Sequence, residues 1–420
     1  MKNILKDFKP VVKNSNFVHL WSSQVLSLVT INIMNFVLLT RLFEKTGSSL
    51  ATSLLWIAYA LPAILIGPFA AAIVDVFDRR KILIYSNLLQ AATIFIFALS
   101  HKTSIFFAYG VVIIYSLLNQ FYVPAESASL PSLLPKKLYT HANSLFFMTQ
   151  QASLILGYAS AGILLGLFGF EKTLFLCSAF VFLAFVNVIF LPKIKVSKEN
   201  ISLLEVDLID FFKRIYVGYK FIKGNRNILV PFVLLLGFQV AVSIVTVNVP
   251  ALARDILNIN MNTAGLLIIV PAGLGALIAA FNLPKFIKKG LRKKKIIENS
   301  LFIATLSIFI MTFIIPEISS GFRVFLGLII CLVLGMAFIG ITVPSQTFLQ
   351  ESTPKELYGR VFGNFSFMVT LATIFPVIFS GTITELFGIR MLFFLLGAFS
   401  LTALMFSRNL GQKFINNEKF

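Results

Sequence analysis

The chain has 420 residues, of which 58% are hydrophobic and only 13% are charged. A soluble domain carries about a quarter charged residues, so this composition excludes a soluble globular protein and indicates a membrane protein. The formal net charge of +19 does not indicate a nucleic-acid partner, because the basic residues lie in short gaps between apolar runs, where membrane topology explains them.

Twelve long apolar runs follow one another along the chain, each near or above the roughly 20 residues that a helix needs to cross a bilayer. They predict twelve membrane-spanning helices and therefore an all-α polytopic membrane protein. In chain order the runs occupy residues 18–43, 50–74, 82–100, 104–127, 140–168, 173–191, 227–252, 262–284, 296–316, 321–350, 357–386 and 388–407.

Positive charge is sorted between alternate gaps of this series. The N-terminal segment, every second gap after it and the C-terminal segment hold 29 of the 36 Lys and Arg residues, and the other gaps hold 7. Basic residues stay on the cytoplasmic side of a membrane, so we expect both termini to be cytoplasmic and the number of spans to be even. The same basic loops would attract anionic lipid head groups.

An internal repeat relates the two halves of the chain. The segment 135–139 recurs with one substitution at 354–358, and two flanking residue pairs recur at a matching distance. A repeat of about half the chain length predicts two homologous bundles of six spans each. Because six is even, both bundles have the same orientation, and a pseudo-two-fold axis along the membrane normal relates them.

The predicted domains are an N-terminal bundle over residues 1–191, a linker over 192–226 and a C-terminal bundle over 227–420. The linker is the only sizeable polar stretch, and its apolar residues recur at helical spacing. We expect an amphipathic helix that lies on the cytoplasmic membrane surface. The alternative is a solvated tether that only allows the bundles to move.

The gap between the second and third runs carries Asp75, Arg79 and Arg80. It resembles the signature loop of the major facilitator superfamily, in which an Asp is followed by a basic pair. In that family the loop is a cytoplasmic latch that forms in one state and releases in the other. The resemblance implies such a gate here; the alternative is that the basic residues only set topology. Departures from the family pattern are Ala71, Val76 and Asp78.

Two junctions between predicted spans restrict this resemblance to one branch of the superfamily. Residues 122–144 and 346–363 are similar to the junctions of spans four and five and of spans ten and eleven in one branch of the superfamily. That branch includes bacterial macrolide and siderophore exporters. The resemblance implies two bundles that rock about a central site, export of a lipophilic or amphiphilic small molecule, and Arg360 as a member of the gate. In the fifth run Tyr158 replaces the Pro of the Gly-Pro pair of drug antiporters.

No acidic or basic residue falls near the middle of a predicted span, so neutral polar and aromatic side chains would line a transport path. Such a lining suits a bulky lipophilic substrate. In the family, spans one, four, seven and ten line the central cavity, and most candidates fall there; each candidate could instead form a hydrogen bond between helices. The candidates are Gln24, Thr30, Asn32, Asn35, Asn119, Gln120, Gln150, Gln151, Gln239, Asn248, Gln346 and Asn364.

Few acids lie close to the membrane on the predicted cytoplasmic side. Glu126 follows Pro124, whose missing N–H interrupts the helical hydrogen bonds and leaves room for a wet pocket around the carboxylate. Glu126 and Asp75 are therefore the candidates for proton coupling. The alternative for Glu126 is a solvated carboxylate at the end of a helix.

Enzymes and primary pumps lack support in the residue inventory. No Gly-Lys pair is present, so there is no phosphate-binding loop, and three His and two Cys do not form a known metal-binding pattern. We therefore expect no catalytic activity and no cofactor, and a monomeric transporter in a bacterial cytoplasmic membrane. Two alternatives remain: a transporter of lysophospholipids or other lipids, and a membrane sensor or scaffold that does not transport.

Overall fold

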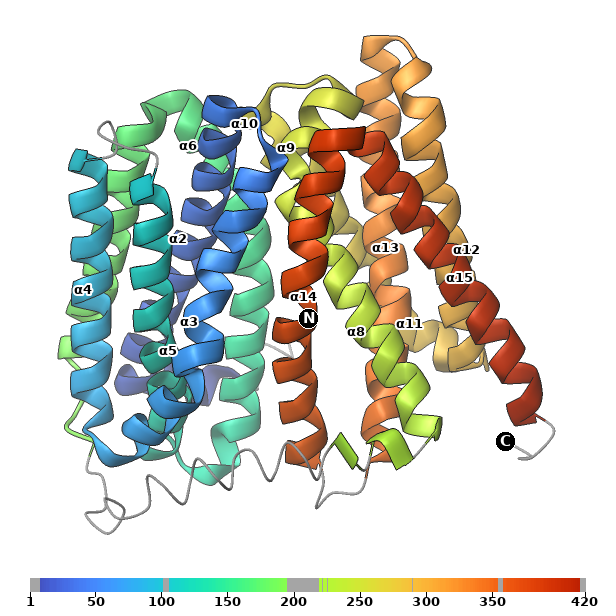
Figure 1. Ribbon diagram of the computed structural model, residues 1–420. Helices are drawn as coiled ribbons and strands as arrows, with labels where there is room; N and C mark the ends of the chain where they lie inside the picture. The colour runs from blue at the N-terminus through green and yellow to red at the C-terminus, as the bar shows by residue number, and fades with distance from the viewer. Residues whose placement is uncertain are drawn as a thin grey trace. The chain divides into compact units, whose positions relative to one another are not determined.

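The computed structural model is helical, with no strand in the ranges that it describes (Figure 1). The amphipathic helix predicted within 192–226 falls largely outside those ranges and stays a prediction. The described residues are 8–100, 106–194, 219–220, 222–224, 226–288, 290–353 and 358–415.

The apolar runs of the first half form five long helices. Their bounds agree with the predicted runs to within a few residues, except that the fifth and sixth runs form one bent helix and the fourth helix continues further. The helices are α2 (Ser15–Thr46), α3 (Ser49–Val76), α4 (Arg79–Ser100), α5 (Phe106–Leu133) and α6 (Tyr139–Ile189).

The apolar runs of the second half form a similar series, interrupted by short π-helical stretches at 252–257, 265–269 and 310–314. The second and third stretches divide the eighth and ninth runs into shorter elements, and the seventh run is broken at Asn248, between α8 and α9. The helices are α8 (Arg226–Val247), α9 (Val249–Ala251), α10 (Met261–Ala264), α11 (Val270–Lys288), α12 (Lys293–Phe309), α13 (Ser320–Ser352), α14 (Tyr358–Phe387) and α15 (Ile389–Ile415).

Gly169 explains why two predicted spans appear as one helix. Its φ of 73° and ψ of 176° interrupt α6, and glycine adopts such a conformation without steric cost. The apolar helical segment from Lys136 to Ile189 has 54 residues, far more than the roughly 20 of a single crossing. The helix therefore accounts for two spans that meet at Gly169.

The number of candidate spans agrees with the prediction. Among the described residues, 10 helices are long and apolar enough to cross a membrane, or 11 if the bent pair α8 and α9 is one span. Since α6 is long enough for two crossings, the helices account for the twelve predicted runs.

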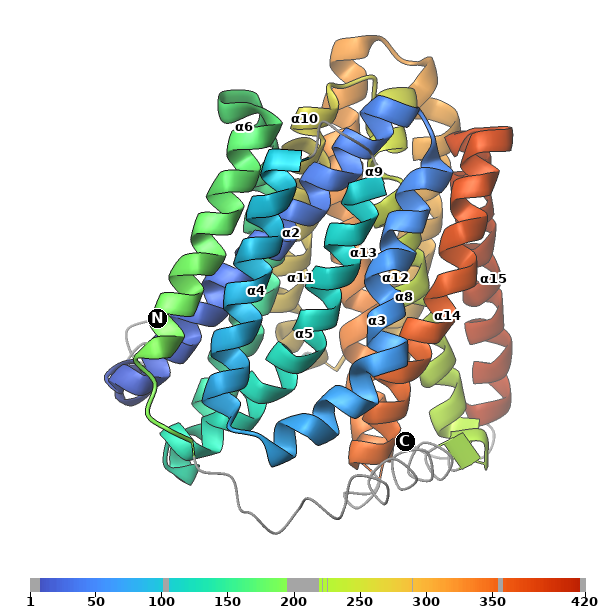
Figure 2. The same ribbon diagram turned by 60° about the vertical axis from the view of Figure 1, so that its left-hand side comes forward.

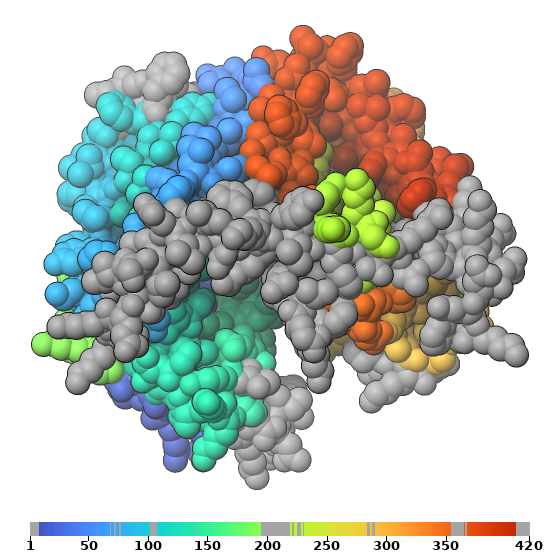
Figure 3. All heavy atoms as spheres, turned by 60° about the horizontal axis from the view of Figure 1, so that its bottom comes forward, coloured from blue at the N-terminus to red at the C-terminus, as the bar shows by residue number. Residues whose placement is uncertain are grey.

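The chain divides into two compact units. Unit 1 comprises Met1–Leu42 and Leu55–Lys213, and unit 2 comprises Phe43–Leu54 and Arg214–Phe420. In unit 1, α4 packs against both α5 and α6 (Figure 2). A buried apolar cluster there joins α2, α3, α4 and α5 through Leu20, Val74, Leu83 and Tyr122. The end of the molecule at which α5 ends and α6 begins, in teal-green, is seen in Figure 3.

In unit 2, α13 packs against α8, α11 and α12. The α11–α13 contact depends on glycines: a side chain at Gly275 would collide with the backbone of Leu332, and one at Gly335 with that of Ala272. Small residues allow such close helix contact inside a membrane. Large apolar side chains cover the outer surface instead, with Phe281 75% exposed, as expected of helices that face lipid.

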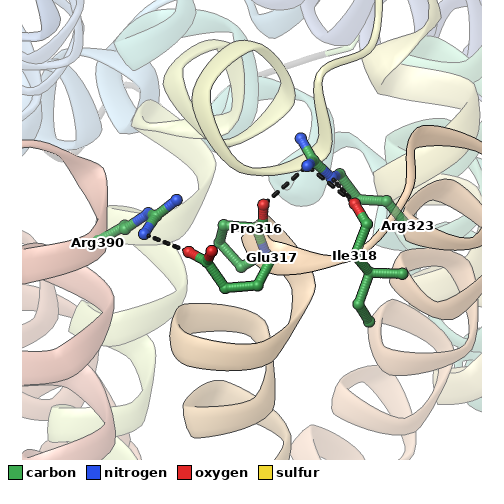
Figure 4. Close-up of polar contacts among 5 residues, drawn as sticks. All are labelled: Pro316, Glu317, Ile318, Arg323 and Arg390. Carbon is green, nitrogen blue, oxygen red and sulfur yellow. Dashed lines mark hydrogen bonds and ion pairs between the residues drawn. The ribbon is translucent and has the colours of Figure 1, made fainter.

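Arg323 and Arg390, from the gaps between apolar runs that hold few basic residues, have structural roles in unit 2 (Figure 4). Arg323 donates to the backbone carbonyls of Pro316 and Ile318, at 2.7 and 2.9 Å, where the segment after α12 ends and α13 begins. Arg390, at the start of α15, forms an exposed ion pair with Glu317 at 3.0 Å. A guanidinium suits carbonyls at a helix end, since the helix dipole leaves them partly negative.

Candidate functional site

Glu126 lies inside helix α5, two turns before its end at Leu133, and only 5% of its surface is exposed. The alternative of a solvated carboxylate at a helix end is therefore wrong. The helix continues through Pro124 and Pro131, as membrane helices often do, because neighbouring groups satisfy the backbone carbonyls that lose their donor.

Two neutral side chains donate hydrogen bonds to the Glu126 carboxylate. The Tyr122 hydroxyl donates to Oε1 at 3.0 Å, and the Gln24 amide Nε2 donates to Oε2 at 3.2 Å. Within the described ranges, no Lys, Arg or His forms an ion pair with this carboxylate. Neutral donors from α5 and α2 thus replace the cation that a buried carboxylate would usually have.

The hydrogen bonds continue from Tyr122 across three helices. Ser23 of α2 lies 3.1 Å from the Tyr122 hydroxyl, Asn87 of α4 donates to Ser23 at 3.0 Å, and Ser27 donates to Asn87 at 3.3 Å. Because the hydrogen of the Tyr122 hydroxyl is used on Glu126, Ser23 is the donor to Tyr122. Every donor in this series therefore points towards the carboxylate.

Two of the predicted gate residues, Arg79 and Arg80, begin helix α4 in unit 1. The guanidinium of Arg79 donates to the carbonyl of Ala128 on α5 at 2.9 Å, and that of Arg80 donates to the carbonyl of Ile189 on α6 at 2.6 Å. These bonds connect the first turn of α4 to two neighbouring helices. The side chains of Asp75 on α3 and Arg360 on α14 lie outside the described part of the structure, so the gate itself stays a prediction.

The two cavity candidates of α5 have different contacts, and only Asn119 has a described contact with an aromatic side chain of α3. Asn119 donates to the hydroxyl of Tyr59 on α3 at 3.5 Å, and Trp56 packs beside Tyr59 with ring centroids 6.3 Å apart. Gln120 donates to the backbone of its own helix at Ser116 and is partly exposed. The group of Trp56, Tyr59 and Asn119 offers one amide and aromatic faces without a charge.

The remaining candidates of unit 1 differ in exposure. Thr30 is buried and its hydroxyl has no partner among the described residues. Asn32 and Asn35 are partly buried, and the Asn32 amide donates to its own helix at Leu28. Gln150 and Gln151 are exposed on α6.

Among the candidates of unit 2, Asn248 has the most defined surroundings. It lies between α8 and α9, where the span bends by 57°, and it is 1% exposed. Its amide donates to Ser380 and accepts from Thr384, both on α14 and both at 3.0 Å. Gln239 is partly buried and Gln346 is exposed; Asn364 lies on α14, with a side chain outside the described part.

Sequence reasoning did not identify Tyr122, Ser23, Ser27 and Asn87 as site residues. A signal existed for Tyr122, since it precedes Glu126 by four residues and so lies on the same helix face. For Ser23 the only signal is its position next to Gln24. Asn87 comes from α4, and only the packing of the helices brings it to the site.

A comparison with protein families decides the identity of the chain. The model of the Major Facilitator Superfamily matches residues 20–376. The chain belongs to the major facilitator superfamily. The predicted fold class is thereby confirmed, and the chain is a multi-pass membrane transporter.

Relatives and solved structures agree with this family. The uncharacterized MFS-type transporter YfiS of Bacillus subtilis is 25% identical, over 93% of this chain and 92% of its own. Macrolide efflux protein A of Streptococcus pyogenes is also 25% identical, over 91% and 92%. Among structures, the POT family transporter PepTSo aligns with a TM-score of 0.73 at 13% identity, covering 97% of this chain and 99% of that chain. A bacterial homologue of the iron transporter ferroportin aligns with a TM-score of 0.71 at 15% identity, covering 94% and 98%.

Proposed function

We propose that this transporter exports a lipophilic or amphiphilic small molecule across a bacterial cytoplasmic membrane, and that protons drive it by binding to Glu126. The observation that carries the proposal is the buried carboxylate itself. Glu126 is 5% exposed, and among the described residues two neutral side chains donate to its carboxylate. An ionisable group inside a membrane is costly to keep and is a functional site by default.

The chemistry of a polar and aromatic group between α3 and α5 supports the substrate class. The group of Trp56, Tyr59 and Asn119 combines aromatic faces with one amide and no charge. Aromatic rings bind bulky apolar molecules, and a few amides fix the orientation of the polar groups that such molecules carry. The likeness to macrolide efflux protein A agrees with this class, since a macrolide is large and mostly apolar.

Proton exchange at Glu126 fits alternating access. A carboxylate that takes a proton on one side of the membrane and releases it on the other converts a proton gradient into a change of charge inside the bundle. Removing that charge changes which hydrogen bonds the helices α2 and α5 form, so it changes their preferred arrangement. Asp75 is the second candidate for this role, at the predicted gate.

A panel of compounds tests the proposal in cells. We expect cells that contain the protein to accumulate less of at least one lipophilic compound, such as a macrolide, and to lose this difference when the proton gradient is collapsed. Glu126→Gln should abolish the difference at normal protein levels. The control Glu317→Gln changes an exposed acid of unit 2 and should retain export.

The cell assay and a competition assay in vesicles together separate the alternatives. Competition by lysophospholipid in vesicles, with no export of the other compounds, would indicate a lipid transporter. No flux of any compound would indicate a sensor or scaffold. Export that persists without a proton gradient would contradict proton coupling and leave export standing.

A further inference from the structure

The amide of Gln24 has one end bound and the other end without a partner. Its Nε2 donates to the Glu126 carboxylate, while its Oε1 is buried and accepts no hydrogen bond from any described residue. The side chain as a whole is 6% exposed. A buried acceptor without a donor costs free energy, so this arrangement needs a reason.

The two protonation states of Glu126 need opposite partners. A carboxylate only accepts hydrogen bonds, whereas a protonated acid has one O–H to donate. A glutamine amide has a donor and an acceptor at its two ends, and a half turn about its last bond exchanges them. The unpartnered Oε1 is the acceptor that a protonated Glu126 would require.

We infer that Gln24 is a positioning residue whose hydrogen bond changes with the protonation state of Glu126. It donates to the carboxylate through Nε2 and accepts from the protonated acid through Oε1. This inference rests on the proposed coupling role of Glu126. Because Gln24 is on α2 and Glu126 is on α5, the exchange of partners changes the connection between these two helices.

The hydrogen bonds beyond Tyr122 extend this change to α4. With Glu126 charged, Ser23 donates to Tyr122 and Asn87 donates to Ser23, so the donors all point towards the charge. Such a chain is polarised as a unit and loses its preferred direction when the charge is removed. α4 begins at Arg79, whose guanidinium donates a hydrogen bond to the carbonyl of Ala128 on α5. Ala128 lies two residues after Glu126 in the sequence. The site is thus connected to the predicted gate.

The titratable groups near Glu126 on the surrounding helices, apart from Tyr122, have described contacts with residues other than Glu126. On α2, His19 lies 3.3 Å from Asn187 of α6. On α4, Arg79 and Arg80 contact backbone carbonyls, and on α5 the titratable neighbour is Tyr122, which bonds Glu126 directly. On α6, His141 packs against the ring of Phe8. On α3, the side chain of Asp75 is outside the described structure.

Gln90 provides a matched control inside the same bundle. It is a buried glutamine on α4, and its Oε1 also has no partner among the described residues. Its Nε2 lies 3.4 Å from the backbone carbonyl of Tyr115, which does not change its charge. Replacing Gln90 therefore repeats the loss of a buried amide without touching the carboxylate.

Infrared difference spectroscopy over a pH series tests the inference without a transport substrate. The samples are the full-length protein in lipid vesicles, as wild type, Glu126→Gln, Gln24→Leu and Gln90→Leu. We expect a carboxyl band that titrates with pH in the wild type and is absent from Glu126→Gln. Gln24→Leu should move the midpoint of this band to higher pH by about one unit, a tenfold change in proton binding. The direction follows because a hydrogen bond to a charged acceptor is stronger than one from a neutral acid.

Gln90→Leu should leave the midpoint of the Glu126 band where it is in the wild type. If Gln24→Leu does not reach the membrane, Gln24→Met keeps the length of the side chain without its amide, and Tyr122→Phe removes the other donor with a shift in the same direction. A midpoint that is unchanged in these variants would overturn the inference while leaving Glu126 as a proton site. A wild type without a titrating band assigned to Glu126 would instead overturn the proposed coupling.

Discussion

The contact between α11 and α13 gives a prediction that depends on geometry alone. Changing Gly335→Ala would place a methyl carbon 2.7 Å from the backbone carbonyl carbon of Ala272, and its oxygen would be closer still. Carbon atoms pack at about 3.5–4.0 Å, so the two helices would have to separate by about 1 Å at this point. The obstacle is backbone, which has no alternative rotamer, and Gly275 makes a similar contact in the opposite direction.

The expected cost follows from two opposing effects. Overpacking a tight contact costs about 1–3 kcal/mol, and a rigid backbone obstacle favours the upper end of that range. Alanine in place of glycine inside a helix recovers about 1 kcal/mol of intrinsic preference. We therefore expect Gly335→Ala to lower the free energy of unfolding by about 2 kcal/mol, close to a thirtyfold change in the unfolding equilibrium.

Denaturant titration of the purified protein in mixed micelles measures this change by circular dichroism. Tryptophan fluorescence is unsuitable, because Trp21 and Trp56 lie in unit 1 whereas Gly335 lies in unit 2. The matched control is Gly321→Ala on the same helix, where a methyl group would have no neighbour within 4 Å. It should not lower stability, and the intrinsic preference of alanine would raise it by at most about 1 kcal/mol. Equal stability of the two variants would show that the contact at Gly335 does not limit how closely the two helices approach.

Three further predictions use the same preparation. Asn248→Ala should lower the free energy of unfolding by about 1–3 kcal/mol, because the buried hydroxyl of Thr384 loses its acceptor; unchanged stability would contradict a stabilising contribution of this hydrogen bond. Lys293→Ala should change stability by less than about 1 kcal/mol in the same titration, because its ion pair with Glu351 is exposed, and a larger loss would show that the pair is shielded from solvent. A maleimide should label Cys177, which is 1% exposed, only after denaturation, and rapid labelling of the folded protein would contradict its burial.

The number and order of the spans could be predicted because membrane helices have a simple sequence signal. A span needs an uninterrupted apolar run of a certain length, and most of the predicted runs agree with the helices to within a few residues. The sequence did not show that the fourth helix would continue to Leu133 and bury Glu126. A proline pattern indicates a helix break in water, whereas a membrane environment favours continuation.

The candidate site could be predicted only in part. Glu126 and Gln24 were both identified, but with different roles, one in proton coupling and the other in the substrate cavity. Their hydrogen bond joins residues that are 102 positions apart, and no periodicity or spacing encodes such a contact. The contribution of Asn87 follows in the same way from the packing of α4 against its neighbours. Helix positions follow from the sequence, whereas contacts between helices require the fold.

Proteoliposomes with an imposed pH gradient test whether the Glu126 carboxylate couples transport to protons. The compound that the cells export most strongly is added outside the vesicles. Its uptake is then measured with and without the gradient. We expect the gradient to accelerate transport by the wild type and to have no effect on Glu126→Gln. Transport that the gradient still accelerates in Glu126→Gln would contradict the claim that this carboxylate carries the proton.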